Sequence, residues 1–401
     1  MRKINSKNKT KHKFKNNTKK KKVKKYSKNK GFLHKFFLIL ILSVLYLSTF
    51  VKRKNNQFYK IWINGAIETI NPSKLPLNEH YKILMPKIKY HEYKKINPEE
   101  EINLFKLEDS VDYKKVKEAG NGNHIYYSCI IAKAKFENLY VREFVEYYIN
   151  LGVEKFYFGD DNPEFVENLS DVLDDYIKKG IVDVEFIYHR NIPHHDFCEY
   201  TFKAVHSRCK WILIFDVDEY LEFVDKNMTL KSYLEMPEFD KCDVIRIHWM
   251  TFDDNNLLYY ENKPLKERFT HALPDNVLNI YHKSIVRGKD YGVDMFSKEK
   301  TAHQPSPLVT EQCGAIGNIE KPGDGIMRPA QFKYCHLRHH TYKTAEEFAI
   351  KMLRGSHPNV KYNYNEIMEY FFKVNEVTEE KLKIIENIVN TTFPQYHKNN
   401  N

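Results

Sequence analysis

Three acidic side chains stand together in the segment Trp211 to Phe223, which reads WILIFDVDEYLEF. An unbroken apolar run, Trp211 to Phe215, leads directly into Asp216, Asp218 and Glu219. Such a run is typical of a strand buried on both faces, and ionised carboxylates at its end are costly unless a cation pairs with them. Because residues i and i+2 of a strand point the same way, we expect Asp216 and Asp218 to converge on Mg²⁺ or Mn²⁺. The alternative is a strand that simply ends in a polar loop.

A second charged segment, Cys335 to Gly355, is basic and runs into a predicted helix. A capping box formed by Thr344 and Glu347 marks the start of that helix. Cations gathered near a helix start oppose its dipole, so we expect an anion such as a diphosphate to dock there. A histidine in this segment is also a candidate third metal ligand. The alternative is that each basic side chain is simply solvated. The basic residues are Arg338, His339, His340, Lys343, Lys351 and Arg354.

A polar loop with interspersed aromatic residues follows the strand-like run from Asp243 to Phe252. It covers residues 253–269 and reads DDNNLLYYENKPLKERF. Aromatic faces beside short polar groups suit a sugar, because the ring stacks on the apolar face of the sugar while Asp and Asn bond its hydroxyls. An ordinary surface loop is the alternative.

Alternating strands and helices must position these groups. From about His124 the pattern predicts strand, helix, strand, helix, strand, helix and strand, which is typical of a mostly parallel α/β sheet covered on both faces. Ligands of such sheets bind outside the carboxyl ends of the strands, where Asp160, Asp161 and the acidic cluster fall. No GxGxxG follows the first strand, which disfavours a dinucleotide fold. The predicted elements cover residues 124–134, 140–151, 153–158, 169–177, 181–188, 195–208 and 211–215.

The basic excess of the chain is confined to its N-terminus. Residues 1–54 contain 19 of the 64 Lys and Arg residues and no Asp or Glu, which leaves 45 basic against 53 acidic residues in the remainder. A nucleic-acid partner is therefore disfavoured, since it requires a basic face on the folded domain. The six cysteines contain no CxxC pair, which makes a zinc site improbable and leaves disulfides or buried thiols open.

The N-terminal segments predict a membrane anchor. Residues 1–34 form a Lys-rich tail, expected to be disordered and cytosolic. Residues 35–53 contain an apolar run flanked by basic residues, which favours an uncleaved transmembrane helix with its C-terminal side across the membrane. Residues 54–122 are interpreted as a stem. The expected location is therefore the secretory pathway, in particular the Golgi, as a type II single-pass protein with its catalytic domain in the lumen.

From about Ser128 to Gly355 the chain resembles the glycosyltransferase-2-like group that includes glycosyltransferase family 92. WILIFDVDEYL is similar to the family's W…DxDE segment, and the blocks YENKPLKERF, HKSIVR and RHHTYKTAEEFAIKMLRG follow in the family's order. Two departures occur. Lys135 to Asn138 stands where the family usually has Lys-Asn-Glu, and His339-His340 stands where it has His-Tyr.

The resemblance implies a GT-A fold, a mostly parallel mixed sheet flanked by helices, at residues 123–355, with a C-terminal helical extension at 356–401. It also implies a membrane-anchored, metal-dependent glycosyltransferase that moves a sugar from a nucleotide-sugar donor to a glycan acceptor. In this interpretation Mn²⁺ or Mg²⁺ is held by Asp216, Asp218 and His339, Glu219 orients the carboxylate pair or the donor sugar, and the donor lies against Asp160, Asp161, Lys343 and Arg354.

An inverting transfer would require a carboxylate base near the acceptor hydroxyl. Asp253, Asp254 and Glu267 are candidates, and Asp254 is preferred because a strand opens into the acceptor loop there. Two rival functions stay open. Another metal-dependent nucleotidyl or phosphoryl transferase would release pyrophosphate from a nucleoside triphosphate, whereas a non-catalytic sugar-binding module would bind sugars without turning over a donor.

Overall fold

The computed structural model describes residues 59–63, 66–70, 124–162, 167–190, 192–296, 305–321, 326–354 and 364–392. Residues 1–56 and 57–401 form two separate units, and all described residues belong to the second. The predicted tail and transmembrane segment therefore lie outside the described residues. Along the described part of the chain, no helix combines the length and apolar character needed to cross a bilayer.

A small hairpin lies within the segment interpreted as a stem. Strand β1 (Tyr59–Ile63) pairs with the antiparallel strand β2 (Ala66–Ile70). Sequence analysis missed these strands, although Asn64-Gly65 between two short runs rich in β-branched and aromatic residues is a typical hairpin signal.

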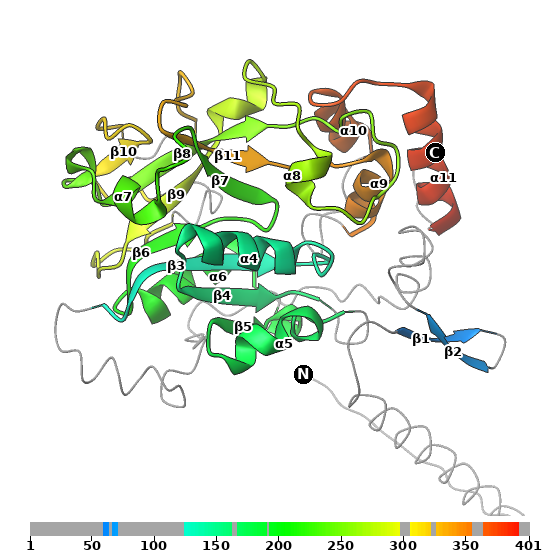
Figure 1. The fold of residues 1–401 in the computed structure, drawn as a ribbon, viewed down its shortest axis with the longest axis horizontal. Helices are drawn as coiled ribbons and strands as arrows, with labels where there is room; N and C mark the ends of the chain where they lie inside the picture. The colour runs from blue at the N-terminus through cyan, green and yellow to red at the C-terminus, as the bar shows by residue number, and fades with distance from the viewer. Residues whose placement is uncertain are drawn as a thin grey trace, which may run out of the picture. The chain divides into compact units, whose positions relative to one another are not determined.

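The first half of the main sheet follows the predicted alternation. Strands β3, β4, β5 and β6 pair in parallel in the order β5-β4-β3-β6, and Figure 1 shows them in cyan and green. Helix α4 ends where Gly152 adopts a left-handed conformation with φ of 104°. The bounds are β3 Tyr126–Ala134, α4 Val141–Leu151, β4 Lys155–Asp160, α5 Ser170–Lys178, β5 Val182–Phe186, α6 His194–Val205 and β6 Cys209–Ile214.

The second half of the sheet makes it mixed rather than uniformly parallel. Beyond β6 the order continues β9-β8-β11-β7, with β10 pairing β8 in parallel. Strand β9 is antiparallel to both β6 and β8, and β11 is parallel to β8 but antiparallel to β7. The bounds are β7 Glu219–Phe223, β8 Val244–Thr251, β9 His282–Arg287, β10 Gln312–Gly314 and β11 Cys335–His339.

Helices pack on both faces and at one end of this sheet. Apolar residues of α4 join one buried cluster with Ile130, and those of α6 join another with Ile131, so the two helices cover opposite faces. Helices α9, α10 and α11 gather at the end to which the β11 arrow points in Figure 1. The remaining bounds are α7 Leu230–Leu234, α8 Leu265–Arg268, α9 Ala345–Arg354, α10 Tyr364–Phe372 and α11 Glu379–Thr392, with 3₁₀ turns at Tyr188–Arg190, Pro237–Phe239 and Val277–Ile280.

Two disulfides join neighbouring parts of the sheet. Cys129 of β3 bonds Cys209 of β6, and Cys242, just before β8, bonds Cys313 of β10. Cys198 and Cys335 are buried free thiols. The cysteines therefore divide between the two uses that the sequence left open.

Candidate active site

The acidic cluster lies in a turn and not at the end of a continuous strand. Strand β6 ends at Ile214 and β7 begins at Glu219, which places Asp216 and Asp218 in the connection between them. The expectation that the two aspartates share one face of a strand was therefore wrong, although the charges of both act to raise the pKa of His339 against the effect of its burial. Asp216 faces Lys283 and His194, whereas Asp218 faces Lys351 and His339. We call Asp216, Asp218 and Glu219 the acidic turn.

Glu219 is the buried anchor of this turn. It has no exposed surface, and its carboxylate accepts hydrogen bonds from the indole Nε1 of Trp249 at 2.8 Å and the backbone N–H of Asp216 at 2.9 Å. Burial raises the pKa of Glu219 well above its usual range, against the opposing attraction of Lys283. These bonds fix the conformation of the turn, so Glu219 orients Asp216 and Asp218.

Lys283 is the buried cation that pairs with Asp216 and Glu219 of the acidic turn, and sequence analysis missed it. Its side chain on β9 is fully buried, with Nζ 2.6 Å from Asp216 Oδ2 and 3.5 Å from Glu219 Oε2. Burial opposes its charge, but the attraction of Asp216 and Glu219 outweighs that effect and raises its pKa. The available signal was a lysine inside the apolar strand HKSIVR, since a buried lysine requires a partner.

Asp218 and His339 face each other across a gap wider than a hydrogen bond. His339 Nε2 lies 3.9 Å from Asp218 Oδ1 and 4.0 Å from Glu219 Oε1. The imidazole packs on Trp249 with ring centroids 3.9 Å apart, and its Nδ1 has no hydrogen-bond partner among the described residues. Burial lowers the pKa of His339 to about 4, so the ring is neutral at pH 7 and keeps a nitrogen lone pair available for a metal ion.

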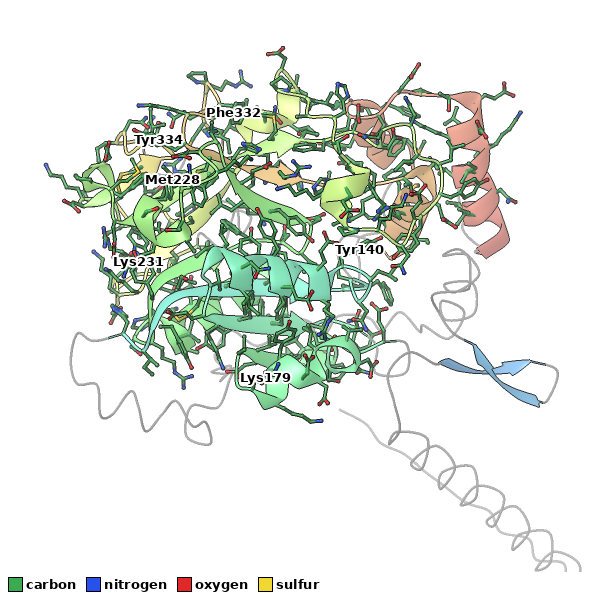
Figure 2. All side chains as sticks on the ribbon, in the orientation of Figure 1. Tyr140, Lys179, Met228, Lys231, Phe332 and Tyr334 are labelled. Atoms are coloured by element: carbon green, nitrogen blue, oxygen red, sulfur yellow. A yellow bond between two sulfur atoms is a disulfide. The ribbon has the colours of Figure 1, made fainter. Side chains whose placement is uncertain are left out.

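Two further lysines approach Asp218. Lys351 of α9 donates to the carbonyl and hydroxyl of Thr341 and lies 3.5 Å from Asp218 Oδ2. Lys343 is buried with Nζ 4.4 Å from the ring centroid of Tyr140, whose place at the start of α4 Figure 2 shows. Within the described residues Lys343 makes no ion pair, and burial lowers its pKa. The nearby ammonium is therefore available to an incoming anion.

The capping box at the start of α9 positions this basic segment. Thr344 and Glu347 exchange hydrogen bonds between side chain and backbone as predicted. Glu347 also accepts two bonds from the Arg268 guanidinium, at 2.8 and 3.0 Å, and one from the Tyr140 hydroxyl at 2.6 Å. Arg354 is the last residue of α9, and its side chain lies outside the described part of the structure.

The two acids at the end of β4 have local partners. Asp160 accepts bonds from the backbone N–H of Asn162 and of Leu169, at the start of α5. Burial raises the pKa of Asp160 to about 6, although these bonds oppose the shift. Asp161 lies 3.1 Å from the Lys133 ammonium. Asp160 thus holds the β4–α5 connection in place, and Asp161 forms a separate ion pair at the same sheet edge.

The preferred base candidate, Asp254, belongs to a buried ion pair. Its carboxylate lies 2.7 Å from Lys381 Nζ of α11, and both side chains are only 2% exposed. Burial raises the pKa of Asp254, with Lys381 opposing. Its neighbour Asp253 is partly exposed and lies 2.6 Å from His271 Nδ1, while Glu267 is exposed on the short helix α8. Among the described contacts, none brings Asp254 to the acidic turn.

The donor set suits a hard divalent cation that completes its coordination with oxygen atoms of a ligand. Mg²⁺ is usually held by one or two carboxylates together with substrate phosphates, and the Asp218–His339 gap offers one carboxylate and one unprotonated imidazole nitrogen. In the ranges that the structure describes, no three His, Cys, Asp or Glu side chains are grouped so as to hold a metal ion by themselves. Lys283 already occupies one oxygen of Asp216.

Clustered carboxylates and ammonium groups at the carboxyl edge of the strands of a mixed α/β sheet are typical of ligand-binding sites in α/β enzymes. The family model "Glycosyltransferase family 92" matches residues 126–384, and the chain belongs to this family. It is therefore a glycosyltransferase, which confirms the resemblance and favours the first of the three functions considered above. A comparison with curated protein sequences finds no match.

Solved structures of S. aureus TarS share a distant likeness. TarS 1–349 is 15% identical, with 68% of this chain and 73% of that chain covered and a TM-score of 0.32. TarS 1–349 in complex with UDP-GlcNAc is 13% identical, with coverage of 68% and 74% and a TM-score of 0.32. TarS 1–349 in complex with UDP is 12% identical, with coverage of 68% and 73% and a TM-score of 0.33.

Proposed function

We propose that this family 92 glycosyltransferase transfers a sugar from a nucleotide-sugar donor to a glycan acceptor with the help of Mn²⁺ or Mg²⁺. One observation carries the proposal. The acidic turn contributes three carboxylates, Lys283 and Lys351 lie within 3.5 Å of them, and Lys343 lies near enough for the charge of Asp218 to act on its pKa. The formal charges balance, so a divalent cation and a diphosphate are best accommodated together, because each neutralises the charge that the other brings.

The residues have separate tasks in this proposal. Asp218 and His339, with the partly exposed carboxylate of Asp216, would hold the metal ion, and a bound metal ion supplies Lewis-acid stabilisation of the departing diphosphate. Lys343 and Lys351 add ammonium groups on the α9 side, where charge grows on the leaving group. Glu219 and Lys283 keep the turn in shape. Asp161 and Arg354 stay candidates for donor contacts, and Asp160 supports Asp161 through the β4–α5 connection.

For the acceptor side we propose Asp253 in place of Asp254 as the carboxylate that receives a proton. Asp253 is partly exposed and bonded to His271, a solvent-facing imidazole, and a base must reach the acceptor hydroxyl. Asp254 is instead used to hold the loop against α11. Asp253→Asn should reduce transfer to an acceptor by about 10²-fold or more, and Asp254→Asn should mainly lower the melting temperature. Equal transfer by Asp253→Asn and the parent would exclude this role.

The test of the function is a donor screen with the full-length protein. UDP-, GDP- and CMP-sugars are incubated with and without Mn²⁺, and release of free nucleotide is measured. We expect metal-dependent hydrolysis of at least one donor and its loss, by about 10²-fold or more, in Asp218→Asn. Asp240→Asn, at an exposed site, is the matched control and should keep the parent rate. If no nucleotide sugar is hydrolysed or bound with Mn²⁺ present, the proposal fails.

We also propose a type II membrane protein whose catalytic domain faces an oxidising secretory lumen, such as the Golgi. The apolar run in residues 35–53 and its flanking charges support the anchor, and the two disulfides suit that compartment. Protease treatment of sealed microsomes should remove the N-terminal tail and spare the folded domain. Digestion of the domain in intact vesicles would reverse the proposed orientation.

A further inference from the structure

A polar groove lies between the loop after β8 and helix α11, and we call it the α11 groove. The groove is open to solvent and has a volume of about 630 Å³. Its lining combines an aromatic ring with carboxylate, amide and ammonium groups. It is lined by Tyr259, Glu379, Glu380, Lys383, Ile384 and Asn387. The residues of α11 recur at positions three and four apart, so they share one face of the helix.

Tyr259 presents its ring to solvent at this groove. The side chain is 55% exposed, although both neighbours turn inward. Leu258 packs against the apolar residues of α9 to α11, and the ring of Tyr260 lies 5.0 Å from the Arg268 guanidinium. Among the described residues, Tyr259 has no ring contact or hydrogen bond. An exposed ring with anchored neighbours is a ready stacking surface, because little conformational entropy is lost when a ligand covers it.

Buried contacts hold the two walls of the groove in a fixed relation. Lys381 of α11 forms the ion pair with Asp254, and the Asn375 side chain accepts from the Asp254 backbone and donates to the Tyr342 carbonyl. The backbone N–H of Tyr260 donates to Glu346 of α9 at 2.8 Å. A buried ion pair fixes the relative positions of the groups that it joins, even where its net contribution to stability is small. The groove is therefore already formed before a ligand binds.

The groove is connected to the active site on both walls. The loop begins where β8 pairs with β11, with the Phe252 backbone N–H bonded to the His339 carbonyl at 3.4 Å. On the other wall, α11 packs on α9, whose Lys351 approaches Asp218. Helix α9, about 10–12 Å across with its side chains, thus links the α11 wall of the groove to the acidic turn. A linear ligand several sugar units long spans the width of that helix.

We propose that the α11 groove binds an uncharged oligosaccharide, namely the part of the acceptor glycan beyond the sugar that is modified. Tyr259 stacks on the apolar face of one sugar, while Glu380 and the exposed ion pair of Lys383 with Glu379, whose N–O distance is 2.6 Å, bond its hydroxyls. The ligand class follows from the lining, because a flat ring beside short-range donors and acceptors matches the alternating apolar and hydroxyl surfaces of a sugar. This inference rests on the proposed function, since it extends the acceptor site of that transfer.

The test measures binding of the full-length protein to an immobilised panel of defined uncharged oligosaccharides, from mono- to pentasaccharides. We expect the parent to bind particular members of three or more sugars, and Tyr259→Ala to weaken that binding about tenfold, which corresponds to about 1.4 kcal/mol. Tyr259→Phe keeps the ring and should retain binding. Tyr370→Ala, at an exposed tyrosine of α10 outside the groove, is the matched control.

Equal binding by the parent and Tyr259→Ala, or binding by the parent to none of the panel, overturns the inference. Binding of the parent protein to peptides immobilised by the same linkage, with no binding to any oligosaccharide, also overturns the inference. A destabilisation of about 1 kcal/mol would lower the melting temperature by about 2 °C or more. Variants that melt within about 2 °C of the parent therefore retain the folded loop. Donor hydrolysis without acceptor is measured separately, so failure of the proposed function and failure of the groove give different results.

Discussion

Replacing Lys283 by Met tests whether the acidic turn depends on one buried ammonium. The substitution keeps an unbranched side chain of similar length but removes the positive charge. Without Lys283, water can hydrate the Asp216 carboxylate, whose side chain is 29% exposed. Water cannot reach the Glu219 carboxylate, because that side chain is fully buried. Loss of one partner from a buried pair costs about 3–5 kcal/mol. The partial exposure of Asp216 favours the lower end, so we expect the free energy of unfolding to fall by about 3 kcal/mol.

The assay is thermal and urea unfolding of the full-length protein in the presence of a chelator. For a domain of this size, 1 kcal/mol corresponds to about 2–4 °C, so Lys283→Met should melt about 6–12 °C below the parent. Lys289→Met is the matched control, because its ion pair with Asp243 lies at the surface and should contribute less than about 1 kcal/mol. Adding Glu219→Gln to Lys283→Met should recover part of the loss.

Equal melting temperatures of Lys283→Met and the parent would overturn this account of the site. They would mean that Asp216 and Glu219 do not need a protein cation, and the charge balance proposed for the site would then have to come from elsewhere. An equal loss of melting temperature in Lys289→Met would also contradict this account, because the destabilisation would then not depend on burial of the lysine.

Two further predictions concern the anion site and the sheet. Lys343→Met should weaken binding of UDP about tenfold or more, since a hydrogen bond to a charged group contributes about 1.5–3 kcal/mol, without lowering the melting temperature. Calorimetric titration checks this, and an unchanged dissociation constant would exclude Lys343 from the donor site. Gly288→Ala should destabilise the domain by about 1–3 kcal/mol or more, because its Cβ would lie 1.7 Å from the Cys209 carbonyl oxygen. A urea midpoint equal to that of the parent would contradict the close approach of these two backbones.

The sequence predicted those parts of the fold that are encoded locally. The elements from β3 to β6 follow from apolar periodicity and from glycines such as Gly152 at a helix end. The capping box of Thr344 and Glu347 is likewise local. The antiparallel insertion of β9 between β6 and β8 joins residues that are distant along the chain, and no short-range pattern encodes that pairing.

The site shows the same division. The acidic turn was recognised because acids after an apolar strand are costly, and its basic counterpart because cations near a helix start are costly. The partners that decide individual roles come from far along the sequence. Lys283 is 67 positions from Asp216, and Lys381 follows Asp254 by more than a hundred residues. Sequence reasoning therefore found the charges but could not tell that Asp254 is buried in an ion pair with Lys381, whereas Asp253 is partly exposed beside His271.

The ion pair between Asp254 and Lys381 also has an evolutionary consequence. Either residue alone would leave a lone charge in a space where both side chains are 2% exposed, so substitution of one residue alone is destabilising. Related chains should therefore vary at these two positions together, as a charged pair or as a pair of apolar residues. Helix α11 and the loop after β8 should therefore be exchanged together, because a recombinant that received only one of them would be destabilised.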